Sequence, residues 1–264
     1  MKMIISFAVF IVLASVVIAS AAVHGEEVSY TSGGGTMKGY LAYDDAAKGK
    51  RPGVLVVHEW WGHNEYSRMR ARKLAEMGYT SLALDMYGDG KQATHPDDAG
   101  KFSGEVMKNM SIATARFAAA MKVLKEHPST DPDHIAAIGY CFGGSVVLNM
   151  ARQGMDLDGV ASFHGGLTTA MPARPGAVKA KILVCNGAAD QFVTAQDISG
   201  FKKEMDGAKA DYQFIEYAGA KHSFTNPAAD ENGKKFNLPL AYNAEADKKS
   251  WTDLEAFLKK AFAK

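Results

Sequence analysis

Short runs of apolar and β-branched residues alternate along this chain with longer stretches of helical periodicity, and this alternation limits the possible folds more than any other feature. The run Gly53–His58 is almost entirely apolar, as in a strand that is buried on both faces of a sheet. A helix is expected from Asn64 to Met77 and a second strand from Thr80 to Met86. Strands joined through helices pair in parallel by right-handed crossovers. The sequence therefore predicts an α/β fold, a mostly parallel central sheet with helices on both faces.

The same alternation continues toward the C-terminus without a repeat or a linker. Before the first buried strand, Val28–Tyr30 and Met37–Tyr43 flank a glycine-rich turn and predict a hairpin. The further expected helices are Glu105–Glu126, Gly144–Gln153, Gln196–Met205 and Asp247–Phe262, and the further strands are His134–Gly139, Gly159–Phe163, Lys181–Asn186 and Tyr212–Tyr217. We therefore expect residues 22–264 to form a single domain.

The N-terminal segment, residues 1–21, has the composition of a secretory signal peptide. Lys2 precedes the apolar run Ile4–Ile18, and small residues after it suit cleavage behind Ala21 or Ala22. The run is shorter than the roughly 20 residues that a membrane-spanning helix needs, although a single N-terminal anchor is the alternative. We expect an exported protein, periplasmic or secreted, without further contact with a membrane.

The charge balance and the cysteine count exclude several classes of function. The chain has 30 Lys and Arg against 29 Asp and Glu, a formal net charge of +1, so nothing predicts binding to nucleic acid. Two cysteines, Cys141 and Cys185, are too few for a disulfide framework. No helical zinc spacing occurs among the candidate ligands, and we expect neither a metal nor another cofactor. The candidate ligands are His58, His63, His95 and His164.

The sharpest motif joins a predicted strand to a predicted helix around Cys141. It reads GYCFGG (139–144), and glycines two residues to either side of the cysteine allow a strained turn that lifts its side chain above the sheet. The positive end of the following helix points at Cys141 and favours both a thiolate and an oxyanion. Cys141 is thus placed for nucleophilic attack. The alternative is a small buried residue in a glycine-rich turn.

Three further reactive residues, Glu59, Asp190 and His222, also follow predicted strands. Ligands of open α/β sheets bind at the carboxyl ends of the strands, so we expect these side chains to meet Cys141 there. The chain order of Cys141, Asp190 and His222 is that of hydrolases with a nucleophile on a strand-to-helix turn. As alternatives, Asp190 could cap the helix that begins near Thr194, and His222 could be an ordinary loop histidine.

Four motifs lie at these strand ends: HEWWG (58–62), GYCFGG (139–144), NGAAD (186–190) and HSF (222–224). Together they resemble the dienelactone hydrolase family of α/β-hydrolases, over nearly the whole chain after the N-terminal segment. The resemblance implies that Cys141 is the nucleophile, His222 the general base and Asp190 its orienting partner. It also implies an oxyanion hole formed by the backbone N–H groups of Trp60 and Phe142.

The resemblance further matches Glu59 to an acidic residue that lies beside the thiol and moves when substrate binds. Repulsion from a nearby carboxylate disfavours a thiolate, so Glu59 is expected to hold Cys141 as an inert thiol at rest. The alternative is an ordinary carboxylate in a salt bridge with Arg68 or Arg70.

The sequence departs from the family where substrate binds. Enzymes that open dienelactones hold the substrate carboxylate with two arginines, at positions where this chain has Asp89 and Asn226. An unpaired buried carboxylate costs several kcal/mol, so a neutral substrate is expected, although Lys91 leaves the point open. We expect the loops 87–103 and 223–244 to form the rim of the pocket. The expected substrate-binding residues are Trp61, Tyr87, Asp89, Phe224 and Asn226.

These features together predict a hydrolase that cleaves a carboxylic ester or lactone through an acyl-enzyme on Cys141. The expected partner is that small-molecule substrate. Two other classes remain open. A thiol redox or oxidant-sensing protein would use Cys141 and would need neither Asp190 nor His222, and a binding protein could keep the fold without catalysis.

Overall fold

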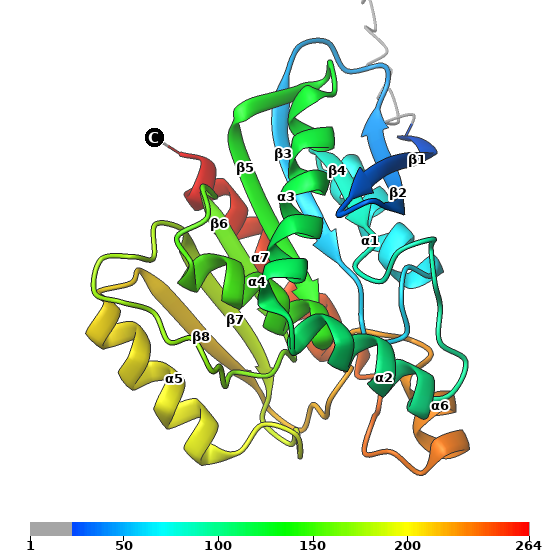
Figure 1. The fold of residues 1–264 in the computed structure, drawn as a ribbon. Coiled ribbons are helices and arrows are strands. Elements are labelled where there is room, and N and C mark those ends of the chain that lie inside the picture. Colours follow the sequence, from blue (N-terminus) through cyan, green and yellow to red (C-terminus); the bar gives the residue numbers. More distant parts are fainter. Residues whose placement is uncertain (1–22, 264) are drawn as a thin grey trace, which may run out of the picture.

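The computed structural model describes residues 23–263, and the predicted signal peptide lies outside them. Its strands are β1 (Val23–Ser32), β2 (Gly35–Asp44), β3 (Arg51–Val57), β4 (Thr80–Leu84), β5 (Thr130–Tyr140), β6 (Gly159–Phe163), β7 (Lys181–Gly187) and β8 (Tyr212–Tyr217). They form one sheet in the order β1-β2-β4-β3-β5-β6-β7-β8 (Figure 1). Neighbouring strands from β4 to β8 in this order pair in parallel, whereas β2 pairs antiparallel with both β1 and β4. The predicted α/β fold is thereby confirmed.

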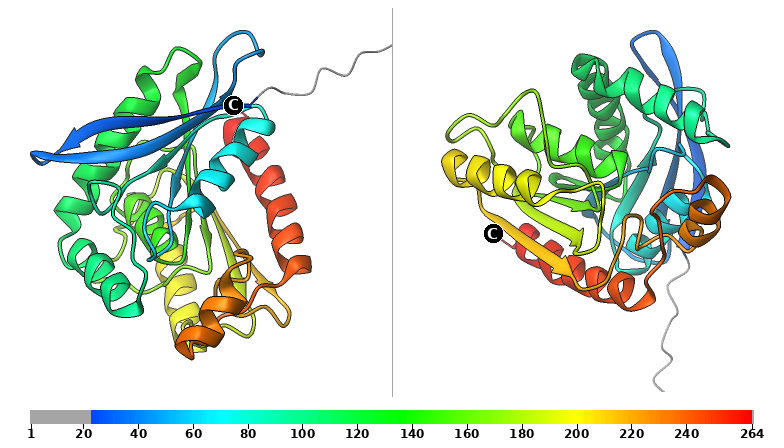
Figure 2. Two further views of the ribbon diagram at one scale, coloured as in Figure 1. Left: turned by 90° about the vertical axis from the view of Figure 1, so that its right-hand side faces the viewer. Right: turned by 90° about the horizontal axis from the view of Figure 1, so that it is seen from below.

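The helices cover both faces of the sheet. They are α1 (Glu65–Glu76), α2 (Pro96–Met107), α3 (Met110–Glu126), α4 (Phe142–Arg152), α5 (Ala195–Ala208), α6 (Ala229–Phe236) and α7 (Ala244–Phe262). Helices α3 and α4 cover one face, and α1 and α7 cover the other (Figure 2). Successive residues of a strand point to opposite faces, so Leu55 and Val57 of β3 pack with the first pair of helices, whereas Val54 and Val56 pack with the second. None of the helices in the described part of the chain combines the length and the apolar character that a membrane span requires.

The predicted N-terminal hairpin is confirmed, and its turn explains the glycines. Gly33 and Gly34 have φ values of +58° and +81°, and β1 pairs with β2 directly on either side of them. Two consecutive residues of positive φ are typical of the tight turn that matches the twist of two hairpin strands. The glycine cluster is therefore required by the backbone.

The prediction that Glu105–Glu126 is mostly helical is confirmed, but the segment is divided between two helices. The end of α2 and the whole of α3 cover it, and Asn109 separates them by accepting a hydrogen bond from the backbone N–H of Ile112. An asparagine side chain competes for backbone donors and favours a helix N-cap over a helix interior. The short helix α6 was also not predicted.

Candidate active site

Cys141 lies on a strained turn between β5 and α4. Its φ is +53°, a left-handed value that residues other than glycine adopt rarely. The backbone is packed tightly around it: a Cβ atom on Gly139 would collide with the carbonyl of Gly143, and one on Gly143 with the carbonyl of Val57. The two glycines therefore allow the turn, which carries Cys141 at the carboxyl end of the sheet.

His222 and Asp190 lie beside this turn and contact each other. Nδ1 of His222 is 2.8 Å from Oδ2 of Asp190, and both residues are 7% exposed. The second carboxylate oxygen of Asp190 accepts the backbone N–H of Phe192 at 2.8 Å. Since Asp190 occupies Nδ1, Nε2 remains for the Cys141 thiol, which interacts with the ring. The N-cap of α5 is Thr194, so Asp190 does not cap that helix.

The charges around His222 favour its protonated form. Burial by itself lowers the pKa of His222, but the interactions with Cys141 and with Asp190 outweigh it and raise the pKa to about 10. The ring is thus held by two groups that stabilise an imidazolium. A histidine in this environment can take a proton from a thiol and return it to a leaving group.

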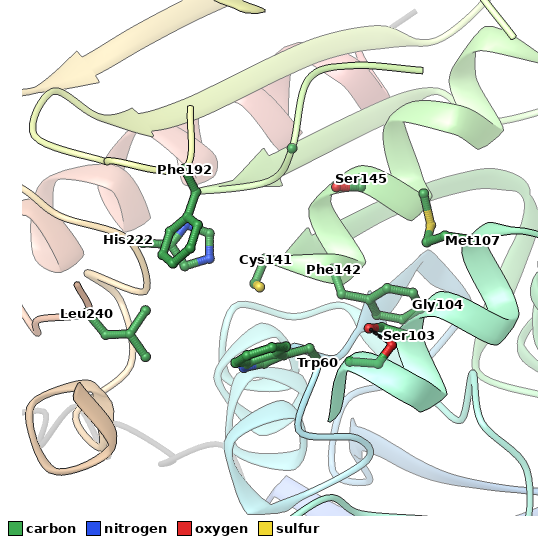
Figure 3. Close-up of a pocket in the computed structure, with 12 residues that line it drawn as sticks. Trp60, Ser103, Gly104, Met107, Cys141, Phe142, Ser145, Phe192, His222 and Leu240 are labelled. Carbon is green, nitrogen blue, oxygen red and sulfur yellow. Dashed lines mark hydrogen bonds between the residues drawn. The ribbon is translucent and has the colours of Figure 1, made fainter. Parts of the chain in front are cut away.

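Cys141 and His222 line a cavity of about 340 Å³, and Asp190 lies behind His222. Figure 3 shows His222 and Leu240 on one side of Cys141, with Phe142 and the α2 residues Gly104 and Met107 on the other. Trp60 and Phe192 add aromatic surface to the lining. A thiol and an imidazole thus border a mainly apolar space, which suits an apolar ligand.

Trp60 and Phe142, whose backbone N–H groups are expected to form an oxyanion hole, both lie at the cavity. Phe142 is the first residue of α4, where a backbone N–H has no acceptor within its own helix. The carbonyl of Trp60 accepts the hydroxyl of Tyr87 at 3.0 Å, which fixes the backbone at the end of β3. The side chains of Trp60 and Phe142 both line the cavity that Cys141 lines.

Comparison with known proteins identifies the family. The model of the dienelactone hydrolase family matches residues 37–262. The chain belongs to the dienelactone hydrolase family. Among curated proteins, it is 30% identical to Protein usf of Aquifex pyrophilus, over 78% of this chain and 90% of that protein.

Two solved structures extend the comparison. A dienelactone hydrolase-like promiscuous phosphotriesterase from metagenomic libraries is 33% identical, with a TM-score of 0.84 over 92% of this chain and 100% of that one. The protein m3DLH is 36% identical, with a TM-score of 0.86 over 92% and 100% of the two chains. This member of the dienelactone hydrolase family is therefore a hydrolase with the α/β-hydrolase fold.

Glu59 lies buried at the end of β3 and is bonded to the loop after His222. Its carboxylate oxygens accept the hydroxyl of Ser223 at 3.0 Å and the side-chain amide of Asn226 at 2.5 Å. Burial raises the pKa of Glu59 above its ordinary value, and these hydrogen bonds partly oppose the rise. The structure thus adds partners that family resemblance did not suggest. The expected effect of Glu59 on the Cys141 thiol stays a prediction.

A buried hydrogen-bonded chain connects Cys141 to α1. The backbone N–H of Cys141 donates to Nδ1 of His164 at 3.1 Å, and Nε2 of His164 lies 2.8 Å from Oγ1 of Thr225. That oxygen is 2.6 Å from the hydroxyl of Tyr66. Burial and the nearby His222 lower the pKa of His164 well below its ordinary value, so its ring is neutral. Because Nδ1 accepts from Cys141, the proton of the ring is on Nε2.

Arg70 holds the far end of this chain. Its Nε donates to the hydroxyl of Tyr66 at 3.2 Å, and its Nη2 contacts Oδ1 of Asp247 at 2.6 Å. Arg68 pairs instead with a glutamate of the N-terminal hairpin. Arg68 and Arg70 are therefore each paired with a carboxylate other than that of Glu59. The alternative interpretation, in which Glu59 forms a salt bridge with one of these arginines, is wrong.

The structure revises the predicted set of substrate-binding residues. Both segments expected at the rim do contribute, through Gly100 and Ser103 from one and Leu240 from the other, but the expectation that 87–103 is a loop was wrong from Pro96 onward, where α2 begins. None of the five residues that were predicted to bind substrate lines this cavity. Trp61 packs against Trp60 and Phe236, Tyr87 lies beneath Trp60, Asp89 is in an exposed turn, Phe224 is fully buried, and Asn226 holds Glu59.

Proposed function

We propose that this protein hydrolyses neutral carboxylic esters or lactones through an acyl-enzyme on Cys141. One arrangement carries the proposal. Cys141 on the strained turn and His222, whose Nδ1 is bonded to Asp190, line the same apolar cavity. Nucleophile, base and orienting carboxylate are the three groups that acyl transfer needs.

The proposed reaction has two halves. The proton of the thiol passes to His222, which gives the ion pair that the raised pKa of His222 favours, and the sulfur of Cys141 then attacks the carbonyl carbon, forming a C–S bond while the carbonyl electron pair moves to oxygen. The N–H groups of Trp60 and Phe142 stabilise that oxyanion. When the C–O bond breaks, the leaving alcohol receives the proton from His222.

In the second half, His222 removes a proton from water, which attacks the thioester carbonyl. The C–S bond then breaks, the carboxylic acid leaves and the sulfur regains its proton. Asp190 keeps Nδ1 of His222 occupied throughout, so that Nε2 faces the reacting atoms.

The lining of the cavity supports a neutral substrate. None of the described residues that line it is a lysine or an arginine, and Lys91, which the sequence left open, is not among them. Desolvation of a carboxylate without a positive partner is strongly unfavourable. We therefore favour neutral esters and lactones over anionic dienelactones.

The test is turnover of p-nitrophenyl butyrate and a small lactone by the wild type and by Cys141→Ala. We expect turnover to be lost in Cys141→Ala and kept in Cys185→Ala, since Cys185 is buried on β7. In His222→Gln, slowed deacylation is expected to leave an acyl mass increase on the peptide that carries Cys141. Full turnover by Cys141→Ala would refute the proposal. A thiol sensor would instead show oxidation of Cys141 without any ester turnover.

Neutral phosphotriesters are a second candidate substrate class. The 33% identical relative is named as a promiscuous phosphotriesterase, and the thiol of Cys141 lines a mainly apolar cavity in this protein. Hydrolysis of diethyl p-nitrophenyl phosphate that is lost in Cys141→Ala would support this activity, whereas equal rates in both proteins would exclude it.

We also propose that the protein is exported and that cleavage after Ala21 or Ala22 produces the mature chain. The support is the sequence of the N-terminal segment. N-terminal sequencing of protein recovered from the periplasm or the medium tests it, and an intact Met1 in the exported protein would refute cleavage.

A further inference from the structure

One side of α2 lies along the cavity beside Cys141. Gly100, Ser103, Gly104 and Met107 line the cavity. Their spacing of three and four residues places them on one side of the helix. The long side chain among them, that of Met107, is at the C-terminal end of α2, so the smallest residues border the middle of the wall.

The two glycines on this side leave open space. A Cβ atom on Gly100 or on Gly104 would meet no atom within 4 Å. The glycines of the Cys141 turn differ, because a Cβ atom there collides with backbone. A larger side chain at Gly100 or Gly104 is therefore compatible with the fold and would extend from residues that border the cavity.

The position of His222 determines which part of an ester reaches α2. The leaving oxygen receives its proton from His222, so the alcohol part lies on the side of Cys141 where His222 and Leu240 are (Figure 3). The acyl substituent is bonded to the same carbon and must point away from the leaving group. That direction leads to Phe142 and to the glycine side of α2.

The side of α2 that borders the cavity offers few hydrogen-bond partners to a polar group of a substrate. Phe142 and Met107 are apolar, and the hydroxyl of Ser103 donates to the carbonyl of Ala99 within α2 at 2.7 Å. An unbranched alkyl chain gains affinity with each methylene that such a surface removes from water.

We infer that α2 is the binding wall for the acyl chain, that Gly100 and Gly104 set the chain length that the site accepts, and that the substrates are esters of unbranched, medium-length fatty acids. This inference rests on the proposed ester hydrolysis at Cys141. It adds specificity-determining residues that the sequence motifs do not contain.

The test is the acyl-length profile of Gly104→Leu with p-nitrophenyl acetate, butyrate, hexanoate and octanoate. We expect kcat/KM of the wild type to rise from acetate to hexanoate, and Gly104→Leu to lower the hexanoate-to-acetate ratio of kcat/KM at least about tenfold. Gly104→Ala should give an intermediate ratio. The matched control is Gly200→Leu in α5, where a Cβ atom also meets open space outside the lining, and it should keep the wild-type ratio.

Three results would overturn the inference. The first is an unchanged ratio in Gly104→Leu, and the second is an equal fall in Gly200→Leu. The third is a changed preference in a series of butyrate esters with alcohols of increasing length, with the acyl profile unchanged, because the wall would then bind the alcohol. Thermal unfolding checks that Gly104→Leu is folded, and Gly104→Ala carries the test if it is not. Failure of the proposed function looks different: Cys141→Ala would keep its turnover.

Discussion

Nε2 of His164 lies 2.8 Å from Oγ1 of Thr225, and this one buried contact joins the turn that carries Cys141 to the loop that carries His222. His164 reaches Cys141 through the backbone N–H of that residue, and Thr225 follows His222 by three positions. The relative position of the proposed nucleophile and base is therefore fixed by residues that do not line the cavity.

Thr225→Val removes this contact while keeping the shape of the side chain. The Nε2–H of His164 then lacks its partner in a buried site, which should lower the free energy of unfolding by about 1–3 kcal/mol. Urea unfolding measures the change, and kcat/KM with p-nitrophenyl butyrate should fall as well. Thr225→Ser keeps the hydroxyl and is the control. Equal losses in both variants would show that the methyl group, not the hydrogen bond, matters.

The raised pKa of His222 predicts a pH-dependent stability. The folded protein holds this proton more tightly than the unfolded chain, whose histidine has a pKa near 6.5. The stabilisation is therefore complete below pH 6.5 and is lost as the pH rises through about 10. Urea unfolding of the wild type and His222→Gln from pH 6 to pH 10 should show a difference that shrinks with rising pH.

Asp190→Asn is the matched variant for this experiment. It removes one of the charges that raise the pKa of His222, so the stabilisation below pH 6.5 should be smaller and should be lost completely at a lower pH than in the wild type. A difference between wild type and His222→Gln that is constant from pH 6 to pH 10 would contradict the assignment.

Glu59→Gln should make Cys141 more reactive toward iodoacetamide. The change removes negative charge from the buried region around the site and leaves an amide that can still bond to Ser223 and Asn226. Alkylation rates across a pH series give the measurement. Glu27→Gln, on the exposed hairpin, is the control for a general effect of charge. Identical profiles for wild type and Glu59→Gln would mean that Glu59 does not act on the sulfur.

A neutral ester should be preferred to its carboxylate-bearing analogue by at least about tenfold in kcat/KM, equivalent to roughly 1.4 kcal/mol. The reason is that the described lining of the cavity contains no lysine or arginine. The matched pair is measured at low and high salt. A preference for the anion that weakens with salt would reveal a positive group near the substrate and contradict this description of the pocket.

Local sequence was sufficient for the turn around Cys141 and for the strand ends. Glycines at 139 and 143 permit a backbone approach that no other residue allows, and parallel topology brings strand ends to one edge. The contact between His164 and Thr225 could not be predicted, because it joins segments 61 positions apart and leaves no spacing pattern. The rim at residues 87–103 was predicted, but the helix α2 within it was not, because its glycines favour a loop and carry no side chain that indicates a role.

The residues that position His222 and the α2 residues that we infer to select the substrate lie on different sides of the sheet. The loop after His222 is secured through Arg70 of α1 and Asp247 of α7, whereas α2 adjoins the face covered by α3 and α4. Substitutions in α2 can therefore accumulate without disturbing those contacts. With this arrangement, substrate specificity can change during evolution while the reaction at Cys141 and His222 stays the same.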